Sequence, residues 1–217
     1  MYSPYGGGAV VGVIDTLDYY MPQFYGGGIV KIVADYEQSY KNAPARYEAG
    51  SPNYPGVIGM GKAIEILEEV GFDAIQAHEQ ELIRRLIDGL EKYDNITVYE
   101  DTEDISDRVG VVTFKFNDLN TFMLAHMLSE KGGVATRRGA FCAHPYVWRL
   151  MGIPDVEVMD YVNCGDVDSP GMIRVSFGIY NTVEEVDEFL RILDEILPEA
   201  QAEQEKMNEK DEFSWKY

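Results

Sequence analysis

Ile173-Arg174-Val175-Ser176-Phe177-Gly178-Ile179 alternates apolar and polar side chains along most of its length. Successive side chains of a β-strand point to opposite faces, so Ile173, Val175 and Phe177 share one face. Arg174 and Ser176 share the other. The stretch therefore predicts a strand with one apolar side and a charged group on its polar side.

A helix is predicted directly after this strand. Thr182 and Glu185 have the spacing of a capping box, which satisfies two free backbone N–H groups at a helix start. The apolar residues that follow recur on one helical stripe: Val186, Leu190, Leu193 and Leu197. Residues 201–217 contain few apolar side chains, and we expect them to form a polar, solvated tail.

Helical spacing and a long loop characterise the first half of the chain. Residues 36–55 are polar and interrupted by prolines, which predicts a loop. Apolar residues then recur at helical spacing over 60–67 and 75–93, which predicts two helices. Glu81 and Arg85 lie four residues apart on the second helix, and we expect them to form an ion pair.

The following residues predict two strands, a helix and a further strand. Residues 96–99 and 109–116 are rich in β-branched and aromatic side chains, which favour strands. A helix is predicted over 120–131, where a pair of glycines closes it. A short strand is predicted over 134–137.

The charge balance excludes several classes of function. The chain has 217 residues, of which 38 are acidic and 18 basic, so its formal net charge is −20. Phosphate backbones and anionic lipid surfaces are repelled by such a surface, and we expect no nucleic-acid or membrane binding. Two cysteines, Cys142 and Cys164, are too few for a disulfide framework. Free thiols and the absence of a signal-peptide pattern predict a cytoplasmic location.

Three short segments carry residue types that suit a small anionic substrate. The first is Arg46-Tyr47-Glu48-Ala49-Gly50-Ser51-Pro52-Asn53. Its glycine and proline fix the backbone around the hydroxyl of Ser51, which can donate to a phosphate oxygen. The same segment is also compatible with an ordinary polar turn.

The second segment contains Arg137, Arg138 and Cys142. Two adjacent arginines make a local positive site in an acidic chain, and such a site favours the nucleophilic thiolate of a cysteine. Free cysteines are also among the most buried residues, so an inert, buried Cys142 is the alternative. His144 can act as a base or pack against its neighbours, and Cys164 has no basic neighbours in sequence.

The third segment is the strand that carries Arg174. A planar guanidinium can bind a carboxylate through two parallel hydrogen bonds. The alternative is a solvated arginine, which is the common state on a polar strand face. We expect no metal site in any of the three segments.

In their order along the chain, these segments resemble the carboxy-terminal part of class V aminotransferases, in particular cysteine desulfurases and selenocysteine lyases. The resemblance runs from residue 1 to about residue 197. Residues 46–53 resemble the family's Arg-Phe-Glu-Ala-Gly-Thr-Pro-Asn, and residues 137–142 resemble its Arg-Thr-Gly-His-His-Cys. Residues 174–182 resemble the strand whose arginine binds the substrate carboxylate.

The resemblance implies pyridoxal phosphate (PLP) as the cofactor and a small amino acid as the substrate. Ser51 would reach the cofactor phosphate of the partner subunit. Arg174 would bind the substrate carboxylate, and Arg137 would be a nearby active-site cation. Cys142 would accept sulfur as a persulfide while L-cysteine becomes alanine, and a sulfur-acceptor protein would be a further partner.

Departures from the family pattern leave two alternatives open. Ala140 and Phe141 replace two histidines, and Arg138 replaces a threonine. They favour another class V aminotransferase, a lyase or an epimerase in which Cys142 is idle. Residues 2–6 resemble the segment just after the cofactor lysine, which implies that this lysine is absent from the chain. The other alternative is therefore an inactive fragment or half-subunit.

The implied fold is α/β, the carboxy-terminal part of a fold-type I PLP-dependent transferase. Its small domain would have helices on a short, mainly antiparallel sheet. We expect residues 1–56 to be a remnant of the large cofactor domain, 57–200 the small domain and 201–217 the tail. Truncation would leave apolar surface uncovered, which predicts a homodimer or association with a lysine-bearing amino-terminal half.

Overall fold

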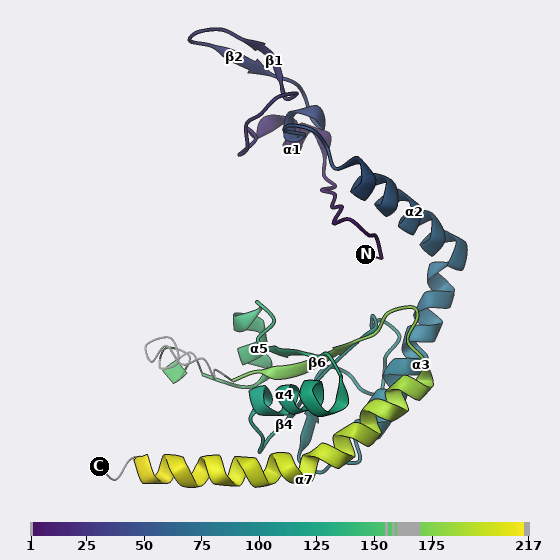
Figure 1. The fold of residues 1–217 in the computed structure, drawn as a ribbon, viewed down its shortest axis with the longest axis vertical. Helices are drawn as coiled ribbons and strands as arrows, with labels where there is room; N and C mark the ends of the chain where they lie inside the picture. Colours follow the sequence, from purple (N-terminus) through teal and green to yellow (C-terminus); the bar gives the residue numbers. More distant parts are fainter. Residues whose placement is uncertain (1, 155, 158, 160–169, 215–217) are drawn as a thin grey trace. The chain divides into compact units, whose positions relative to one another are not determined.

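The structure is a computed structural model that describes residues 2–154, 156–157, 159 and 170–214 (Figure 1). The chain divides into two compact units, Met1–Phe72 and Asp73–Tyr217. No helix in the described ranges has an apolar stretch long enough to cross a lipid bilayer.

The first unit is built from short elements and one long helix. Its elements are α1 (Ile14–Tyr19), β1 (Val30–Val33), β2 (Gln38–Tyr40), the 3-10 turn η1 (Ala45–Tyr47) and α2 (Tyr54–Val70). Strands β1 and β2 pair antiparallel, with Val30 opposite Tyr40. Residues 36–55 therefore contain a strand and a helical turn where the sequence predicts only a loop, because the hairpin supplies backbone partners that polar composition does not reveal.

Arg46 and Tyr47 tie this unit together through backbone carbonyls. The guanidinium of Arg46 donates from Nε to the carbonyl of Lys41 (2.8 Å) and from Nη1 to that of Asp18 (2.6 Å). The hydroxyl of Tyr47 donates to the carbonyl of Leu17 (2.6 Å). These two residues of the 46–53 segment therefore hold η1 against the carboxyl end of α1.

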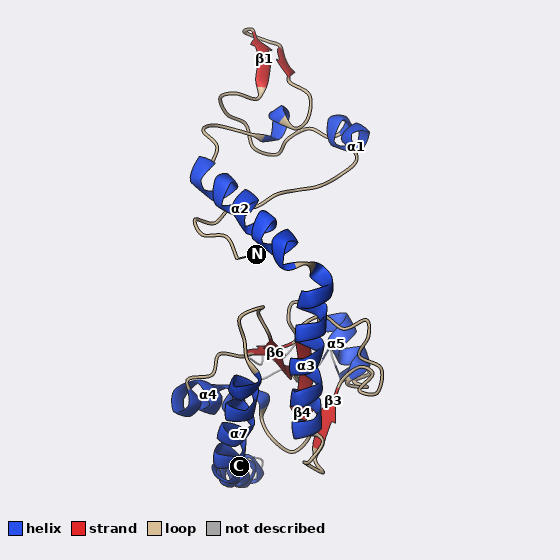
Figure 2. Ribbon diagram, turned by 90° about the vertical axis from the view of Figure 1, so that its right-hand side faces the viewer, coloured by secondary structure: helices blue, strands red, loops and turns tan. Residues whose placement is uncertain are grey.

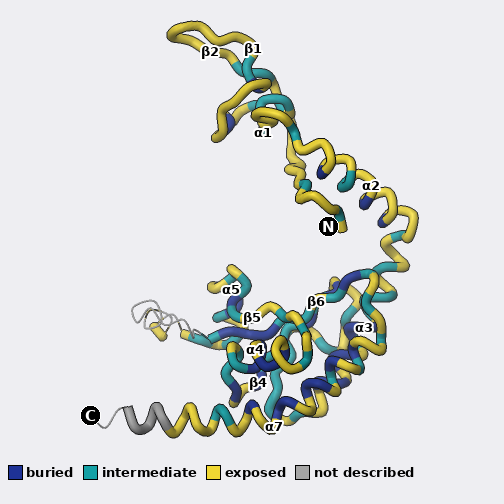
Figure 3. The backbone as a smooth tube through the Cα atoms, in the orientation of Figure 1, coloured by how far each residue is buried: buried dark blue, intermediate teal, exposed yellow. Residues whose placement is uncertain are grey.

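Most large apolar side chains of the first unit are exposed (Figure 3). Ile29 is fully buried, and Ala63 and Leu67 bury one stripe of α2. Many others face solvent, including Val10, Val11, Phe24, Ile32, Val33 and Ile58. Apolar surface of this extent is characteristic of a region that another chain or segment covers.

The second unit is organised around a four-stranded sheet in the order β3-β4-β6-β5, in which every pair is antiparallel. Its strands are β3 (Ile96–Val98), β4 (Val111–Phe116), β5 (Arg137–Gly139) and β6 (Met172–Ser176). Its helices are α3 (Phe72–Leu90), α4 (Thr121–Gly132), α5 (His144–Leu150) and α7 (Val183–Ser214) (Figures 1 and 2). The predicted strand pattern around Ile173 is confirmed, and β5 begins later than predicted.

One face of the sheet carries the main hydrophobic core. Phe114 of β4 and Ile173 of β6 point into it, and helices α3, α4 and α7 cover it. The predicted capping box starts α7: Thr182 N–H donates to Glu185 (3.0 Å), and Glu185 N–H donates to the Thr182 hydroxyl (3.3 Å). Helix α7 continues past Pro198 to Ser214, so the predicted polar tail is helical over residues 201–214.

The opposite face of the sheet carries a smaller cluster under α5. Val147 of α5 packs with Ala140 and with Met172 of β6, and all three are buried. Figure 1 shows α4 and α5 on opposite sides of β6. Strand β6 is therefore covered on both faces.

Helix α3 is joined to α7 by an ion pair that differs from the predicted one. Arg85 binds Asp187 of α7 through two hydrogen bonds of 2.6 and 2.9 Å, instead of pairing with Glu81 on its own helix. A carboxylate that meets both nitrogens of the guanidinium fork gives a better geometry than a neighbour one helical turn away.

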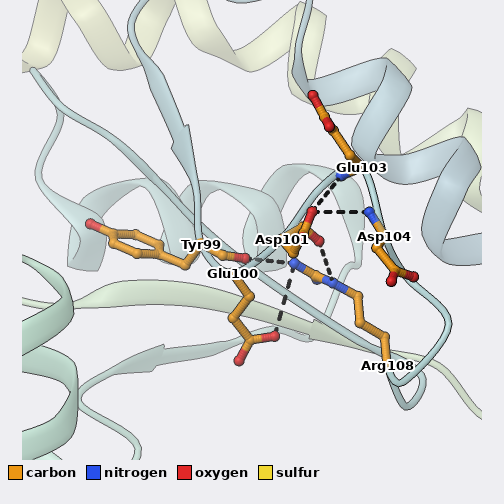
Figure 4. A network of polar contacts seen from close by, with 6 residues as sticks. All are labelled: Tyr99, Glu100, Asp101, Glu103, Asp104 and Arg108. Carbon is orange, nitrogen blue, oxygen red and sulfur yellow. Dashed lines mark hydrogen bonds and ion pairs between the residues drawn. The ribbon is translucent and has the colours of Figure 1, made fainter.

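A buried arginine holds the acidic loop between β3 and β4 (Figure 4). Arg108, whose side chain is 7% exposed, donates to the carbonyls of Tyr99 (2.8 Å) and Asp101 (3.1 Å). The carboxylate of Asp101 in turn accepts the backbone N–H groups of Glu103 and Asp104, both at 2.9 Å. The loop thus folds around one cation.

Replacing Arg108 with lysine tests this role. Arg108 donates to the carbonyls of Tyr99 and Asp101 from two nitrogens of one planar group, which a lysine ammonium cannot do. We therefore expect Arg108→Lys to lower the free energy of unfolding by about 1–3 kcal/mol. Urea unfolding measures the change. Arg85→Lys is the matched control, since its exposed ion pair should contribute less than about 1 kcal/mol. Equal losses in the two variants would contradict the assignment.

Candidate functional site

Three polar side chains lie in a row across the second face of the sheet. Thr113 of β4 is directly opposite Arg174 of β6, and Arg174 is directly opposite Arg137 of β5. Side chains opposite each other in antiparallel strands share a face, with Cβ atoms about 5 Å apart. This is the face that α5 covers, because Met172 lies two residues before Arg174 and packs beneath Val147.

The two arginines of this row have no carboxylate partner among the described residues. The Nε of Arg174 is buried and has no hydrogen-bond partner in that part of the chain. Like charges directly opposite each other repel, and a buried donor without an acceptor carries a desolvation cost. A small carboxylate would relieve both, so the row is suited to binding an anion.

Cys142 lies in a tight turn next to this row. Phe141 and Cys142 both have positive φ, at 55° and 60°, and the N–H of Ala143 closes the turn on the carbonyl of Ala140 at 2.8 Å. Left-handed backbone costs about 1–2 kcal/mol for a residue with a side chain. Cys142 is exposed, so the sequence-based alternative of a buried cysteine is wrong.

The turn contacts the arginine row through Phe141. The guanidinium carbon of Arg174 lies 5.3 Å from the centre of the Phe141 ring, which is within the range of a cation–π contact. The residue that precedes the thiol therefore touches the predicted carboxylate ligand. Neither Phe141 nor Thr113 could be assigned to the site from the sequence, since both depend on which strands become neighbours.

Two glycines allow the backbones to meet beside this turn. A Cβ built on Gly171 would lie 2.5 Å from the Cα of Gly139, closer than any real Cβ contact. Gly139 itself has φ of 92°. The chain therefore enters the Cys142 turn through a backbone contact that only glycine permits.

Two other side chains near the row, His144 and Tyr99, pack against neighbouring side chains. The His144 ring packs edge-on against Trp148, with centroids 5.1 Å apart. Tyr99 packs against the small cluster, and burial raises the pKa of its phenol, which keeps it neutral. Cys164 lies outside the described residues.

Ser51 belongs to the first unit. It is exposed, precedes the N-cap of α2, and its hydroxyl has no hydrogen-bond partner among the described residues. The side chain of Asn53, by contrast, caps α2 by accepting from Gly56 N–H (3.2 Å) and donates to the carbonyl of Tyr5 (2.8 Å). Ser51 is thus free to donate to a phosphate oxygen.

Comparison with known proteins identifies the family. A family model described as aminotransferase class-V matches residues 1–189. The chain belongs to the class V aminotransferase family. It is 33% identical over 187 residues to a probable cysteine desulfurase of Halalkalibacterium halodurans, covering 86% of this chain and 41% of that protein.

Solved structures show the same fold. The cysteine desulfurase CsdA (S-sulfonic acid) from Escherichia coli aligns with a TM-score of 0.70 and 25% identity, covering 87% of this chain and 42% of that one. The apo cysteine desulfurase from Thermococcus onnurineus NA1 aligns with a TM-score of 0.68 and 28% identity, covering 85% and 41%. The chain therefore spans about two fifths of the length of the relatives that it matches.

The family assignment confirms the predicted resemblance and the α/β fold class of PLP-dependent transferases. Proteins of this class V group depend on PLP. The division at residue 56 and the roles of Ser51, Arg137, Cys142 and Arg174 stay predictions. No cluster of metal-binding side chains occurs in the part of the chain that the structure describes.

The positive φ of Cys142 can be tested through stability. Glycine adopts this conformation without the cost that a Cβ imposes, whereas alanine keeps that cost. We expect Cys142→Gly to be more stable than Cys142→Ala by about 1 kcal/mol. Urea unfolding of the two variants measures the difference. A glycine variant that is less stable than the alanine variant would show that the turn is not left-handed at this position.

Proposed function

We propose that this chain supplies the carboxylate-binding and thiol-bearing part of a PLP-dependent cysteine desulfurase. The observation that carries the proposal is the Arg137–Arg174 pair, which has no acidic partner among the described residues and lies next to an exposed thiol. The relatives named as cysteine desulfurases support the choice of reaction.

The arginine pair suits the carboxylate of an amino acid. Arg174 has a buried Nε donor without a partner, and a carboxylate oxygen is the acceptor that such a donor requires. Arg137 adds a second positive charge from the neighbouring strand. The pair would orient L-cysteine with its carboxylate on the sheet and its sulfur free to meet Cys142.

Cys142 would act as the nucleophile. PLP, when bound, supplies the electron sink that allows the carbon–sulfur bond of the substrate to break. The Cys142 thiolate attacks the substrate sulfur, so a sulfur–sulfur bond forms as the substrate's Cβ–sulfur bond breaks. The electron pair of the broken bond passes to Cβ, which takes up a proton and leaves as part of alanine. Cys142 retains the sulfur as a persulfide.

Ser51 suits the cofactor phosphate, whereas Lys31, Lys41 and Lys62 lie in segments that do not resemble the family's cofactor-lysine segment. Lys62 is paired with Glu65 at 2.9 Å, and the Nζ of Lys31 donates to Asn42 at 3.4 Å. We infer that the cofactor lysine lies outside residues 1–217 and that the exposed apolar residues of the first unit are covered by a further segment or chain. Treating the isolated chain with PLP and borohydride should give no stoichiometric label at one lysine. Such a label would refute the inference that the cofactor lysine lies outside these residues.

The thiol step is tested with the chain coexpressed with a polypeptide that carries the family's cofactor-lysine segment. We expect Cys142→Ala to abolish sulfide release from L-cysteine, because the attacking sulfur is gone, while PLP absorbance is retained. Sulfide release in the presence of a reductant measures the effect. Release at the wild-type rate would remove Cys142 from the reaction.

The carboxylate site is tested in the same assembly. Arg174→Gln removes a charged hydrogen bond of about 1.5–3 kcal/mol, so we expect KM for L-cysteine to rise about 10- to 150-fold. Initial rates over a range of L-cysteine concentrations measure the change. Lys206→Gln, an equal change of charge on α7, is the control. An unchanged KM in Arg174→Gln would exclude it as the carboxylate ligand.

A second candidate function is supported by Phe141. Its ring cannot donate or accept a proton, unlike the histidine that the family has before its cysteine. An aminotransferase, lyase or epimerase of the same family with an idle Cys142 would accommodate this replacement. Amino-acid turnover that forms no persulfide and is unaffected by Cys142→Ala would favour it over the desulfurase.

A further inference from the structure

The guanidinium of Arg174 lacks the partners that hold other arginines of the second unit. Arg84 and Arg108 each donate to two backbone carbonyls, and Arg85 binds both oxygens of one carboxylate. Arg174 has no carboxylate partner among the described residues, and its buried Nε has no acceptor there. It also lies directly opposite Arg137, so like charges repel each other. An arginine side chain has many rotamers, and these must be restricted when a ligand binds.

The Arg174 guanidinium contacts the ring of Phe141. Its central carbon lies over this ring, 5.3 Å from the ring centre, and the negative face of an aromatic ring attracts a cation. Both side chains are half-buried, which makes such a contact stronger than at a fully exposed site. A cation–π contact leaves the N–H edge of the guanidinium available to a carboxylate. The ring can therefore restrict Arg174 without competing with a ligand.

The backbone around Phe141 keeps its ring in place. Phe141 has a left-handed backbone with φ of 55°, and the N–H of Ala143 closes the turn on the carbonyl of Ala140 at 2.8 Å. Ala140 is buried in the small cluster under α5, and Phe141 packs against the same cluster. Met172 also belongs to it and lies two residues before Arg174 on β6. The ring and the guanidinium are therefore anchored on one set of buried contacts.

A second cation–π pair in the described chain offers a matched comparison. The guanidinium of Arg138 stacks 3.4 Å from the ring centre of Phe122. Arg138 is opposite Ile173 in the β5–β6 pairing and so projects from the other face of β5 than Arg137 does. The Phe122 pair thus has the same chemistry as the Phe141 pair, but it lies on the opposite face of the sheet from the carboxylate row.

We propose that Phe141 is a positioning residue whose ring holds the Arg174 guanidinium ready for the substrate carboxylate. The carboxylate-binding role of Arg174 rests on the proposed function, and it applies to both candidate reactions because both take an amino acid. Phe141 directly precedes Cys142, so the ring also ties the carboxylate ligand to the turn that carries the thiol. A guanidinium that is already ordered loses less side-chain entropy when the substrate binds. The ring therefore lowers KM without taking part in the later chemical steps.

The first test measures the order of the Arg174 side chain in the full chain, without cofactor or substrate. The nitrogens are isotopically labelled, and the Nε–H NMR signal that disappears in Arg174→Gln is assigned to Arg174. Its heteronuclear NOE reports motion on the picosecond-to-nanosecond timescale. We expect a value near that of the β6 backbone in the wild type and a loss of about half in Phe141→Leu. Phe141→Tyr keeps an aromatic face toward the cation and should keep the wild-type value.

The second test measures turnover in the assembly coexpressed with the cofactor-lysine segment. We expect Phe141→Leu to raise KM for the amino-acid substrate about three- to tenfold and to leave kcat within about twofold of the wild type. Phe141→Tyr should keep both constants. Phe122→Leu removes a cation–π contact of the same kind on the other face of the sheet, so it should change neither KM nor the order of Arg174. The backbone amide signals of β6 show whether each variant is folded.

An Arg174 side chain that stays equally ordered in Phe141→Leu would overturn the proposal. Equal losses of order in Phe141→Leu and Phe141→Tyr would also overturn it, because the shape of the turn rather than the aromatic face would then matter. A fall in kcat with unchanged KM in Phe141→Leu would assign the residue to the thiol turn instead. Failure of the proposed carboxylate site is seen separately, as an unchanged KM in Arg174→Gln, while the NMR measurement still reports on the contact between Phe141 and Arg174.

Discussion

Strand β6 is packed on both of its faces, and the site depends on that constraint. Ile173 is held in the main core, while Met172 is held in the cluster under α5. Because strand side chains alternate, these contacts fix Arg174 on the α5 side, opposite Arg137. A slip of one residue would move Arg174 into the core, where an unpaired charge is prohibitively costly. Hydrophobic packing therefore determines where the cationic pair lies.

The sequence predicts those features that arise from local patterns. The strand around Ile173, the helix that ends at Gly132 and the capping box at Thr182 each depend on residues within one element. Pairing between distant segments could not be predicted. Arg85 binds Asp187 rather than Glu81 because α7 packs along α3, and Phe141 reaches Arg174 because β5 and β6 become neighbours. The sequence therefore identified candidate site residues, but it could not show which of them are in contact.

The 46–53 segment shows that several side chains of a family motif have structural roles. Arg46 and Tyr47 donate to carbonyls of the α1 region, and Asn53 caps α2. These bonds are internal to the first unit, and they hold the segment in place. The hydroxyl of Ser51 has no such partner in the described chain, so it has no structural role of this kind. A match to the motif alone cannot show which side chains hold the segment in place, whereas the hydrogen bonds do.

Because the chain is acidic overall, the arginines around Cys142 attract anions only at short range. At physiological ionic strength charges are screened over about 8 Å, so a molecule approaching from afar meets little net field. Close to β5 it meets the guanidinium groups of Arg137 and Arg174, which have no carboxylate partner among the described residues. A small carboxylate would gain from this arrangement, because the buried Nε of Arg174 lacks an acceptor in the described chain. A long polyanion gains there too, but it meets the acidic remainder of the surface at every other point, so the same charge distribution that admits the first disfavours the second.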